Sequence, residues 1–358
     1  RMHIPELILN WPEEPEEYVH GLRSFKGLPI LACVAILFNF QLNPVSPYIG
    51  SGQLDGEGIP PDFFSDVDVR KGFAYAFDYD RYIREVFMGE ASQPATPVIE
   101  GLPYHNPEQD KYSFNLTKAE QHFRAAWRGE MWANGFTMGI TYNRGNIPRM
   151  KVCEILKSGV ESLNPKFHIE IHEVDWYTFL KQLVDRELTL FLFGDMAILP
   201  DSYELLYSFM HSEGDLAYFQ GYSNPTVDAL IEEGMRTMDE TRRLIISYEL
   251  QRIYHEDCIG IPRYQPFRRH WERDRVQGWY YNPIYPGGYY YHYWKGYKGD
   301  TDKDYDVDLD DLYSVLIGYG LTLEEAMARY GVPAGTDVDG DGWIDLDDLF
   351  WVLVNYDS

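Results

Sequence analysis

The alternation of apolar and polar positions along the chain predicts a body built from both strands and helices. An apolar run from Leu28 to Phe38 indicates a buried strand, which we expect to cover residues 28–42. Residues 136–142 and 168–174 alternate as strands, and residues 188–193 are continuously apolar, as is typical of an interior strand. Helical patterns separate these strands. This β-α-β-α-β order implies an α/β fold whose sheet is at least partly parallel.

Apolar residues that recur every three or four positions predict helices, and polar residues indicate where those helices begin. We expect one helix after Ser65 or Asp66 and another from Thr117 to about Trp127. Asn224 followed by proline is typical of a helix start, and Asp239 is expected to cap a further long helix. The segment from about residue 259 to 293 is rich in aromatic and turn residues and predicts further β structure.

Two acidic segments near the C-terminus repeat each other at an offset of 37 residues. Each has carboxylates at positions 1, 3, 5, 9 and 12, which suits a hard cation that takes side chains, one main-chain carbonyl at position 7 and a bidentate carboxylate at position 12. The expected ligands of the first loop are Asp300, Asp302, Asp304, Asp306, Asp308 and Asp311. Those of the second loop are Asp337, Asp339, Asp341, Trp343, Asp345 and Asp348. Position 6 is Gly342 in the second loop but Tyr305 in the first, a departure that predicts a weaker first site.

The repeat continues into two short amphipathic segments, residues 312–319 and 349–356. Between them, Thr322 and Glu325 form the capping-box pattern of a third helix. A duplicated calcium loop–helix of this length resembles a dockerin domain, which implies two bound calcium ions and a cohesin-type module as partner. Loop positions 10 and 11 are Leu and Asp in both copies, not the Ser-Thr pair of the best-known dockerins, so a cohesin partner is a hypothesis. The alternative is an acidic, solvated tail.

Composition and charge narrow the classes of function. The 358 residues are 45% hydrophobic with a net charge of −26, enough for one large or two ordinary domains and a small module. Residues 300–358 hold 16 acidic against two basic residues, so −14 of the charge falls there and −12 on the rest. Nucleic acid is therefore excluded as a partner, because a phosphate backbone needs a basic face. The three cysteines lack metal-type spacing, and we expect buried thiols.

The chain begins with Arg1 and has no basic-then-apolar leader, so we expect an N-terminal portion, with any signal or anchor, to be missing. The longest apolar run is too short to span a membrane. Calcium loops and the glycosylation pattern at Asn115 favour an extracellular, cell-surface or periplasmic location. Thr117 with Glu120 can equally be explained as a helix cap.

Several segments of the body occur in an order that resembles family 5 of the solute-binding proteins of ABC transporters. They are Phe38-Asn39, residues 66–80, the Gly89…Pro94…Pro97 segment, Asp175-Trp176-Tyr177, residues 224–231 and residues 276–283. Gly72 stands where the family usually has alanine. The resemblance implies an α/β, periplasmic-binding-protein type II-like lobe, here incomplete, beside a small all-α dockerin with two calcium loop–helix units. It also implies an ABC permease as the partner of the full-length protein.

From this resemblance we expect four segments. Residues 1–60 would continue from a missing first lobe, 61–255 would form the distal lobe, 256–295 would return to the first lobe, and 296–358 would be the calcium module. With one wall of the cleft missing, the chain should bind a solute poorly.

The same family often has a W-x-x-D-Y-x-D-P loop after the apolar strand, whose aspartate binds the amino terminus of a peptide ligand. Asp195 is our candidate for that carboxylate, and the alternative is a turn or cap residue. The solute could be a small peptide, a nickel complex or an oligosaccharide. We expect no enzyme, because the chain has no Gly-x-Ser-x-Gly elbow, His-Glu-x-x-His helix or phosphate loop. The rival hypotheses are a dockerin-bearing polysaccharide hydrolase and a surface or scaffold protein.

Overall fold

A computed structural model of the chain describes residues 22–273, 276–283, 293–304 and 306–356. Residues 27–268 form one compact unit, and the remainder of the described residues form a second one. Each unit is described by itself. The predictions for residues 1–21, for residues 284–292 and for Tyr305 lie outside the described residues.

The first unit is a mixed α/β structure around a central sheet, as the sequence pattern predicts. The strands lie in the order β1-β7-β2-β6, and β2 pairs antiparallel with both β6 and β7. The strands β4 and β5 form a separate parallel pair, which confirms the parallel component. The strand bounds are β1 (Leu22–Pro29), β2 (Ala32–Phe38), β3 (Ala91–Ser92), β4 (Phe136–Asn143), β5 (Phe167–Val174), β6 (Leu190–Met196) and β7 (Gly260–Arg273).

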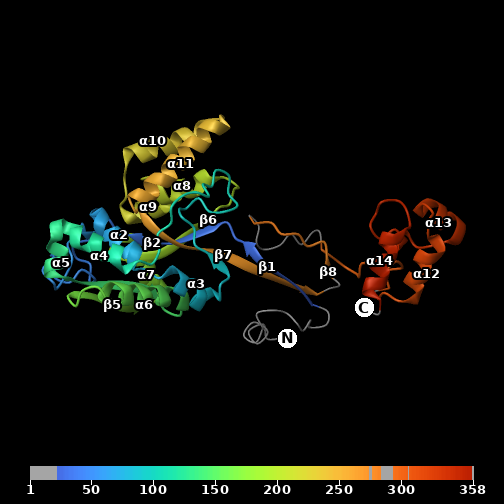
Figure 1. Cartoon of the computed structure of the whole chain (residues 1–358), viewed down its shortest axis with the longest axis horizontal. Coiled ribbons are helices and arrows are strands. Elements are labelled where there is room, and N and C mark those ends of the chain that lie inside the picture. Colours follow the sequence, from blue (N-terminus) through green and yellow to red (C-terminus); the bar gives the residue numbers. More distant parts are fainter. Residues whose placement is uncertain (1–21, 274–275, 284–292, 305, 357–358) are drawn as a thin grey trace. The chain divides into compact units, whose positions relative to one another are not determined.

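Helices cover both faces of these strands (Figure 1), with α8, α10 and α11 on one side and α2, α4 and α6 on the other. The alternation along β2 explains this arrangement, because Ile36 and Phe38 enter the main core cluster with α2 and α6. The helices are α2 (Val67–Ala76), α3 (Tyr79–Phe87), α4 (Leu116–Ala125), α5 (Glu130–Asn134), α6 (Ile147–Glu161), α7 (Trp176–Val184), α8 (Ser202–Met210), α9 (Asp215–Gln220), α10 (Pro225–Arg236) and α11 (Glu240–Glu256). Short 3-10 turns occur at η1 (Phe63–Ser65) and η2 (Ala126–Gly129).

The predicted helix starts mostly coincide with side-chain caps. The carboxylate of Asp66 accepts the N–H of Asp68, and Asn224 and Asp239 cap α10 and α11 in the same way. One start is wrong: Asn115, not Thr117, caps α4 by accepting the N–H of Lys118. Asparagine is preferred over threonine at the N-cap, so cap preference agrees with the observed start.

The predicted strand over residues 28–42 is also wrong. The structure has two strands instead, because the chain bends at Leu31 and Pro29 has no N–H to donate to a continuous ladder. Both strands neighbour β7, one on each side, so the apolar run crosses from one side of that strand to the other. The second strand ends at Phe38, where the amide of Asn39 donates to the carbonyls of Arg186 and Leu188.

In the second unit, residues 296–356 contain three helices. They are α12 (Leu309–Gly318), α13 (Leu323–Tyr330) and α14 (Leu346–Asn355), with a 3-10 turn η4 (Ala334–Thr336). Helix α14 begins and ends 37 residues after α12, the same offset that separates the two acidic segments. The core of these helices is a small cluster of Val307, Val315, Ala326, Val332, Ile344 and Val352. This unit also contains the short pair β8 (Val276–Gln277) and β9 (Trp294–Lys295).

Candidate functional site

The first acidic loop brings part of its predicted ligand set together. Carboxylate oxygens of Asp300, Asp302 and Asp311 lie within 4.8 Å of one another, and Asp306, Asp308 and Asp311 form a second such group. Asp311 belongs to both groups and is 1% exposed. Its Oδ1 accepts the N–H of Thr301 at 2.5 Å, and its Oδ2 accepts the N–H of Asp308 at 2.9 Å. Asp311, the last carboxylate of the loop, therefore links the beginning of the loop to its end by hydrogen bonds.

The second loop repeats this construction at the same positions. Asp337, Asp339 and Asp348 group within 4.8 Å, and Asp348 is fully buried. Its Oδ1 accepts the N–H of Val338 at 2.5 Å, and its Oδ2 accepts the N–H of Asp345 at 2.8 Å. In each loop, a buried carboxylate at position 12 thus accepts N–H groups from positions 2 and 9, both earlier in the loop.

The remaining predicted ligands lie along the same loops but outside these groups. Asp304 accepts the N–H of Asp306, and Asp341 accepts the N–H of Trp343. Asp345 caps α14, as Asp308 caps α12. Trp343 could contribute only its main-chain carbonyl, as position 7 requires.

The electrostatics of the loops suit a cation. Burial raises the pKa of Asp348 above its usual value, and the neighbouring charge of Asp339 adds to that rise. The pKa of Asp302 and the pKa of Asp306 are also raised, first by desolvation and then by the carboxylates around them. A divalent cation would remove this mutual repulsion, and oxygen ligands are those that calcium takes. The residues present therefore fit a calcium ion in each loop.

In the body, Asp195 lies at the end of β6, opposite Cys33 of β2. Its side chain is partly exposed, and its Oδ1 accepts the N–H of Met196. Asp201, the other carboxylate of this loop, is engaged elsewhere: it caps α8 and pairs with Arg243 at 2.6 Å. Asp195 is thus the carboxylate of the loop that is not committed to a helix or an ion pair with a described residue, and its role in binding a solute stays a prediction.

The loop between these aspartates is hydrogen-bonded to Glu204 and presents apolar side chains. The carboxylate of Glu204 accepts the N–H groups of Ile198 and Leu199 at 3.0 and 2.8 Å. The side chains of Ile198 and Leu199 are more than half exposed. An ammonium group would find no charged partner at these two positions.

Two arginines near the end of β6 were not predicted. The guanidinium of Arg149 lies over the rings of Trp176, Phe179 and Phe193 at 5.1 to 5.4 Å from their centroids. Burial, and after it the positive charge of Arg263, lower the pKa of Arg149 to about 10. The only available sequence signal for Arg263 was a basic residue inside the apolar segment that continues from Ile259 to Tyr264.

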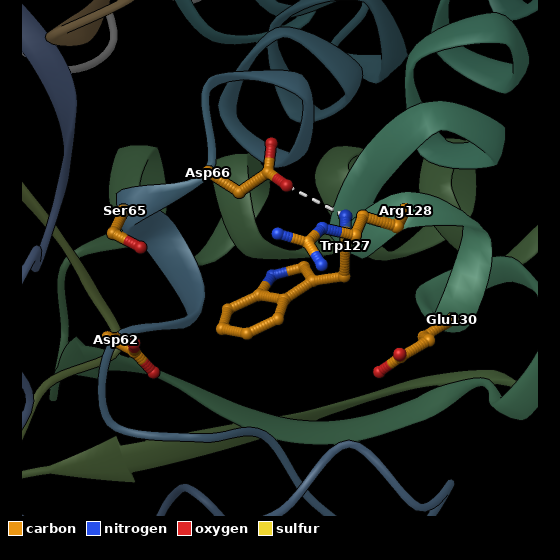
Figure 2. Close-up of a pocket in the computed structure, with 6 residues that line it drawn as sticks. All are labelled: Asp62, Ser65, Asp66, Trp127, Arg128 and Glu130. Carbon is orange, nitrogen blue, oxygen red and sulfur yellow. Dashed lines mark hydrogen bonds between the residues drawn. The ribbon is translucent and has the colours of Figure 1, made fainter.

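A pocket of about 530 Å³ lies at the start of α2 and is lined by Asp62, Ser65, Asp66, Trp127, Arg128 and Glu130 (Figure 2). Trp127, Arg128 and Gly129 all have left-handed backbone angles, with φ of 50°, 54° and 90°. For residues with a Cβ this conformation costs roughly 1–2 kcal/mol each. The N–H of Trp127 donates to Asp66 at 2.7 Å, which holds the turn in place. The helix predicted to reach Trp127 ends two residues earlier for this reason.

Comparisons with known proteins agree with this fold. The family model of the bacterial extracellular solute-binding proteins, family 5, matches residues 20–216. A di/tripeptide-binding protein (protein 2) of Pseudomonas aeruginosa is 22% identical over 62% of this chain and 41% of its own length. The oligopeptide-binding protein AppA of Bacillus subtilis, solved with a nonapeptide, is 17% identical, with a TM-score of 0.60 over 77% of this chain and 53% of its own.

A nickel-binding relative has the same fold. NikA of Staphylococcus aureus, solved with Ni(L-His)2, is 16% identical, with a TM-score of 0.55 over 74% of this chain and 51% of its own. This chain spans less than half the length of the curated relatives that it matches. Within the described residues, no helix combines the length and the apolar character needed to cross a membrane. Because the family model covers more than half of the sequence, the chain belongs to the bacterial extracellular solute-binding proteins, family 5.

Proposed function

We propose that the chain is an extracytoplasmic solute-binding component of an ABC importer that carries a calcium-dependent, dockerin-type docking module. The solute-binding part follows from the family and from the periplasmic-binding-protein type II fold of its structural neighbours. Its function is binding rather than catalysis, its ligand is a small peptide or another small solute such as an oligosaccharide, and its membrane partner is an ABC permease. Residues 296–358 form the docking module.

The observation that carries the calcium assignment is the repeated hydrogen-bond pattern of the two loops. In both loops, the aspartate at position 1 accepts the N–H of position 4, the aspartate at position 3 accepts that of position 5, and the aspartate at position 9 accepts that of position 11. In both loops, the aspartate at position 12 is buried. Residues with the same structure at the same offset are expected to bind the same ion, so the module should take two calcium ions.

A duplicated apolar surface supports a protein partner for this module. Exposed large side chains recur at four- and three-residue spacing, and therefore on one face, of α12 and of α14. They are Leu309, Tyr313 and Leu316 on the first helix and Leu346, Phe350 and Leu353 on the second. Apolar faces of this kind favour a protein-binding surface, and a cohesin-type module is the partner that the dockerin resemblance implies.

Calcium titration of the whole chain by calorimetry tests the module. We expect two ions for the native chain and one each for Asp311→Ala and Asp348→Ala, because each change removes the expected bidentate ligand of one loop. Asp310→Ala and Asp347→Ala, which remove exposed carboxylates at position 11, should still bind two. Unchanged calcium binding by Asp348→Ala would contradict the assignment.

Partner and solute need separate tests. A panel of cohesin modules should retain the chain in calcium and release it in EDTA, and retention without calcium would contradict calcium-dependent docking.

For the solute, Asp195→Asn should weaken whatever peptide binding the native chain has. Because the chain spans only 41% of the length of a matched relative, we expect peptide affinity far below that of full-length relatives.

A further inference from the structure

The pocket beside Trp127 has the features of a second ligand site, separate from the loop that contains Asp195. Its volume of about 530 Å³ is in the range of small-molecule pockets. The side chain of Trp127 packs against the main core cluster, and the indole N–H donates to the carbonyl of Phe63 at 3.3 Å. These contacts hold the ring in position, and Trp127 also lines the pocket.

The backbone around this tryptophan is held in an unfavourable conformation. Trp127 and Arg128 are consecutive non-glycine residues in the left-handed region, followed by Gly129. Asp66 stabilises the turn, since one of its oxygens accepts the N–H of Trp127 and the other accepts the N–H of Asp68. Strain that the surrounding structure maintains is often found at ligand sites. Here the strained turn places the indole of Trp127 and the charged side chains of Arg128 and Glu130 at one pocket.

The charges in the pocket favour a cation. Asp62 and Glu130 lie on either side of the indole in Figure 2, and neither side chain has a hydrogen-bond or ion-pair partner among the described residues. Asp66 adds a third carboxylate, while Arg128 is the one basic side chain of the lining. Three negative groups and one positive group around an aromatic ring repel anions and attract positive charge.

The arrangement does not fit a bare metal ion. A divalent metal needs several oxygens converging on one point, and the acidic groups whose oxygens lie within 4.8 Å of one another in the described residues do not include Asp62, Asp66 or Glu130. The space between the carboxylates is occupied by a ring surface instead. A cation that is large, weakly hydrated and able to lie on an indole suits this surface better.

We propose that the pocket binds an organic ammonium group, with the indole of Trp127 as its platform and the carboxylates of Asp62 and Glu130 as its counter-charges. Arg128 competes with the ligand for the same negative groups. Its side chain is exposed and has no ion-pair partner within the described residues, so an incoming cation can displace it.

Calorimetric titration of the whole chain with choline, at low ionic strength, tests the proposal. The comparison ligand is 3,3-dimethylbutan-1-ol, which has the same shape without the charge. Choline should bind with a saturable signal that weakens as salt is added, and the neutral alcohol should not bind. Equal binding of both compounds, or no binding of choline, would overturn the proposal.

Three variants separate this pocket from the acidic C-terminal loops, which could also attract choline. The double change Asp62→Asn with Glu130→Gln should weaken choline binding on the order of tenfold, since exposed charge pairs are each worth a few-fold. Arg128→Gln should strengthen it a few-fold, because it removes the competing charge. Glu108→Gln, an exposed carboxylate outside the pocket, should change nothing.

The opposite signs of these effects make the test specific. All the altered side chains lack partners among the described residues, so each variant should keep the thermal midpoint of the native chain. Weaker choline binding by Arg128→Gln would overturn the ammonium assignment, and so would saturable binding of a neutral sugar such as glucose in its place.

Discussion

Two buried arginines of the body, Arg70 and Arg263, differ in how many hydrogen-bond partners surround their charged groups. The guanidinium of Arg70 donates to the main-chain carbonyls of Phe64, Ser65, Asp257 and Cys258 and lies over the ring of Phe40. The side chain of Arg263 is only 1% exposed, yet its one hydrogen bond within the described residues goes to the hydroxyl of Tyr82, and its Nε has no partner. The Arg70 guanidinium is therefore surrounded by carbonyl oxygens, whereas that of Arg263 has one hydroxyl and the rings of Tyr82 and Tyr264 beside it.

Replacing Arg70 by lysine should destabilise the body. A lysine ammonium cannot reproduce the planar fork of donors, so at least two buried carbonyls would lose their partners. Each such loss costs about 1–3 kcal/mol, and we expect the free energy of unfolding to fall by about 2–4 kcal/mol in denaturant titrations. Arg81→Lys, at an exposed pair with Glu85, is the matched control and should change stability by less than about 0.5 kcal/mol. A similarly small loss of stability in Arg70→Lys would show that the hydrogen bonds of Arg70 to these carbonyls do not stabilise the body.

Replacing Arg263 by methionine should have the opposite sign. Methionine fills a similar volume without charge, and exchanging an incompletely paired buried ion for an apolar side chain is commonly neutral or stabilising by about 1–4 kcal/mol. The lost hydrogen bond to Tyr82 reduces this gain by about 1 kcal/mol, and the lost contacts with the rings of Tyr82 and Tyr264 reduce it further. We therefore expect the free energy of unfolding to stay constant or to rise. A fall of more than about 1 kcal/mol would show that Arg263 has a stabilising role that its described contacts do not explain.

At the scale of elements, the contact between α2 and α4 depends on one glycine. A Cβ built at Gly72 would lie 2.3 Å from Cε1 of Phe123, so α4 can approach only because that atom is missing. This explains why the chain departs here from the alanine usual in the family. Phe123 in turn packs edge-on against Phe73 and Phe167 and cannot move freely.

We expect Gly72→Ala to destabilise the body although alanine is the better helix former. The intrinsic gain is about 1 kcal/mol. Overpacking typically costs about 1–3 kcal/mol, and a contact of this length lies at the upper end of that range. The free energy of unfolding should fall by about 1–2 kcal/mol, and Phe123→Leu in the same chain should restore part of it. A more stable single variant would mean that α4 shifts without cost.

Elements with a local signal could be predicted from the sequence, and those decided by tertiary contacts could not. The caps at Asp66 and Asp239 depend on neighbouring residues, and so do the acidic loops, whose 37-residue repeat is reproduced in helices α12 and α14. The division of the apolar run between β1 and β2 depends on β7, more than 200 residues away in the chain. The left-handed turn at Trp127 likewise depends on Asp66, a partner 61 residues distant.

At the scale of the whole molecule, the chain combines two units with different sources of stability. The body has an extensive buried core of aromatic and aliphatic side chains. The core cluster of residues 296–356 has only six buried hydrophobic residues among those described, and two buried aspartates lie in the loops beside it. Small modules of this kind usually need a metal or disulfides. The calcium module should therefore depend on its ions while the body does not.

Differential scanning calorimetry of the whole chain should consequently resolve two transitions, of which calcium moves one. At a free calcium concentration of 100 times the dissociation constant, each site adds about 2.7 kcal/mol to the stability of the folded module. EDTA should lower the midpoint of that transition and leave the other unchanged. The chain with both Asp311→Ala and Asp348→Ala should lose the calcium shift, whereas Gly72→Ala should lower only the calcium-independent transition. A single transition that moves as a whole with calcium, or a body transition that follows the loop variants, would show that the two units do not fold independently.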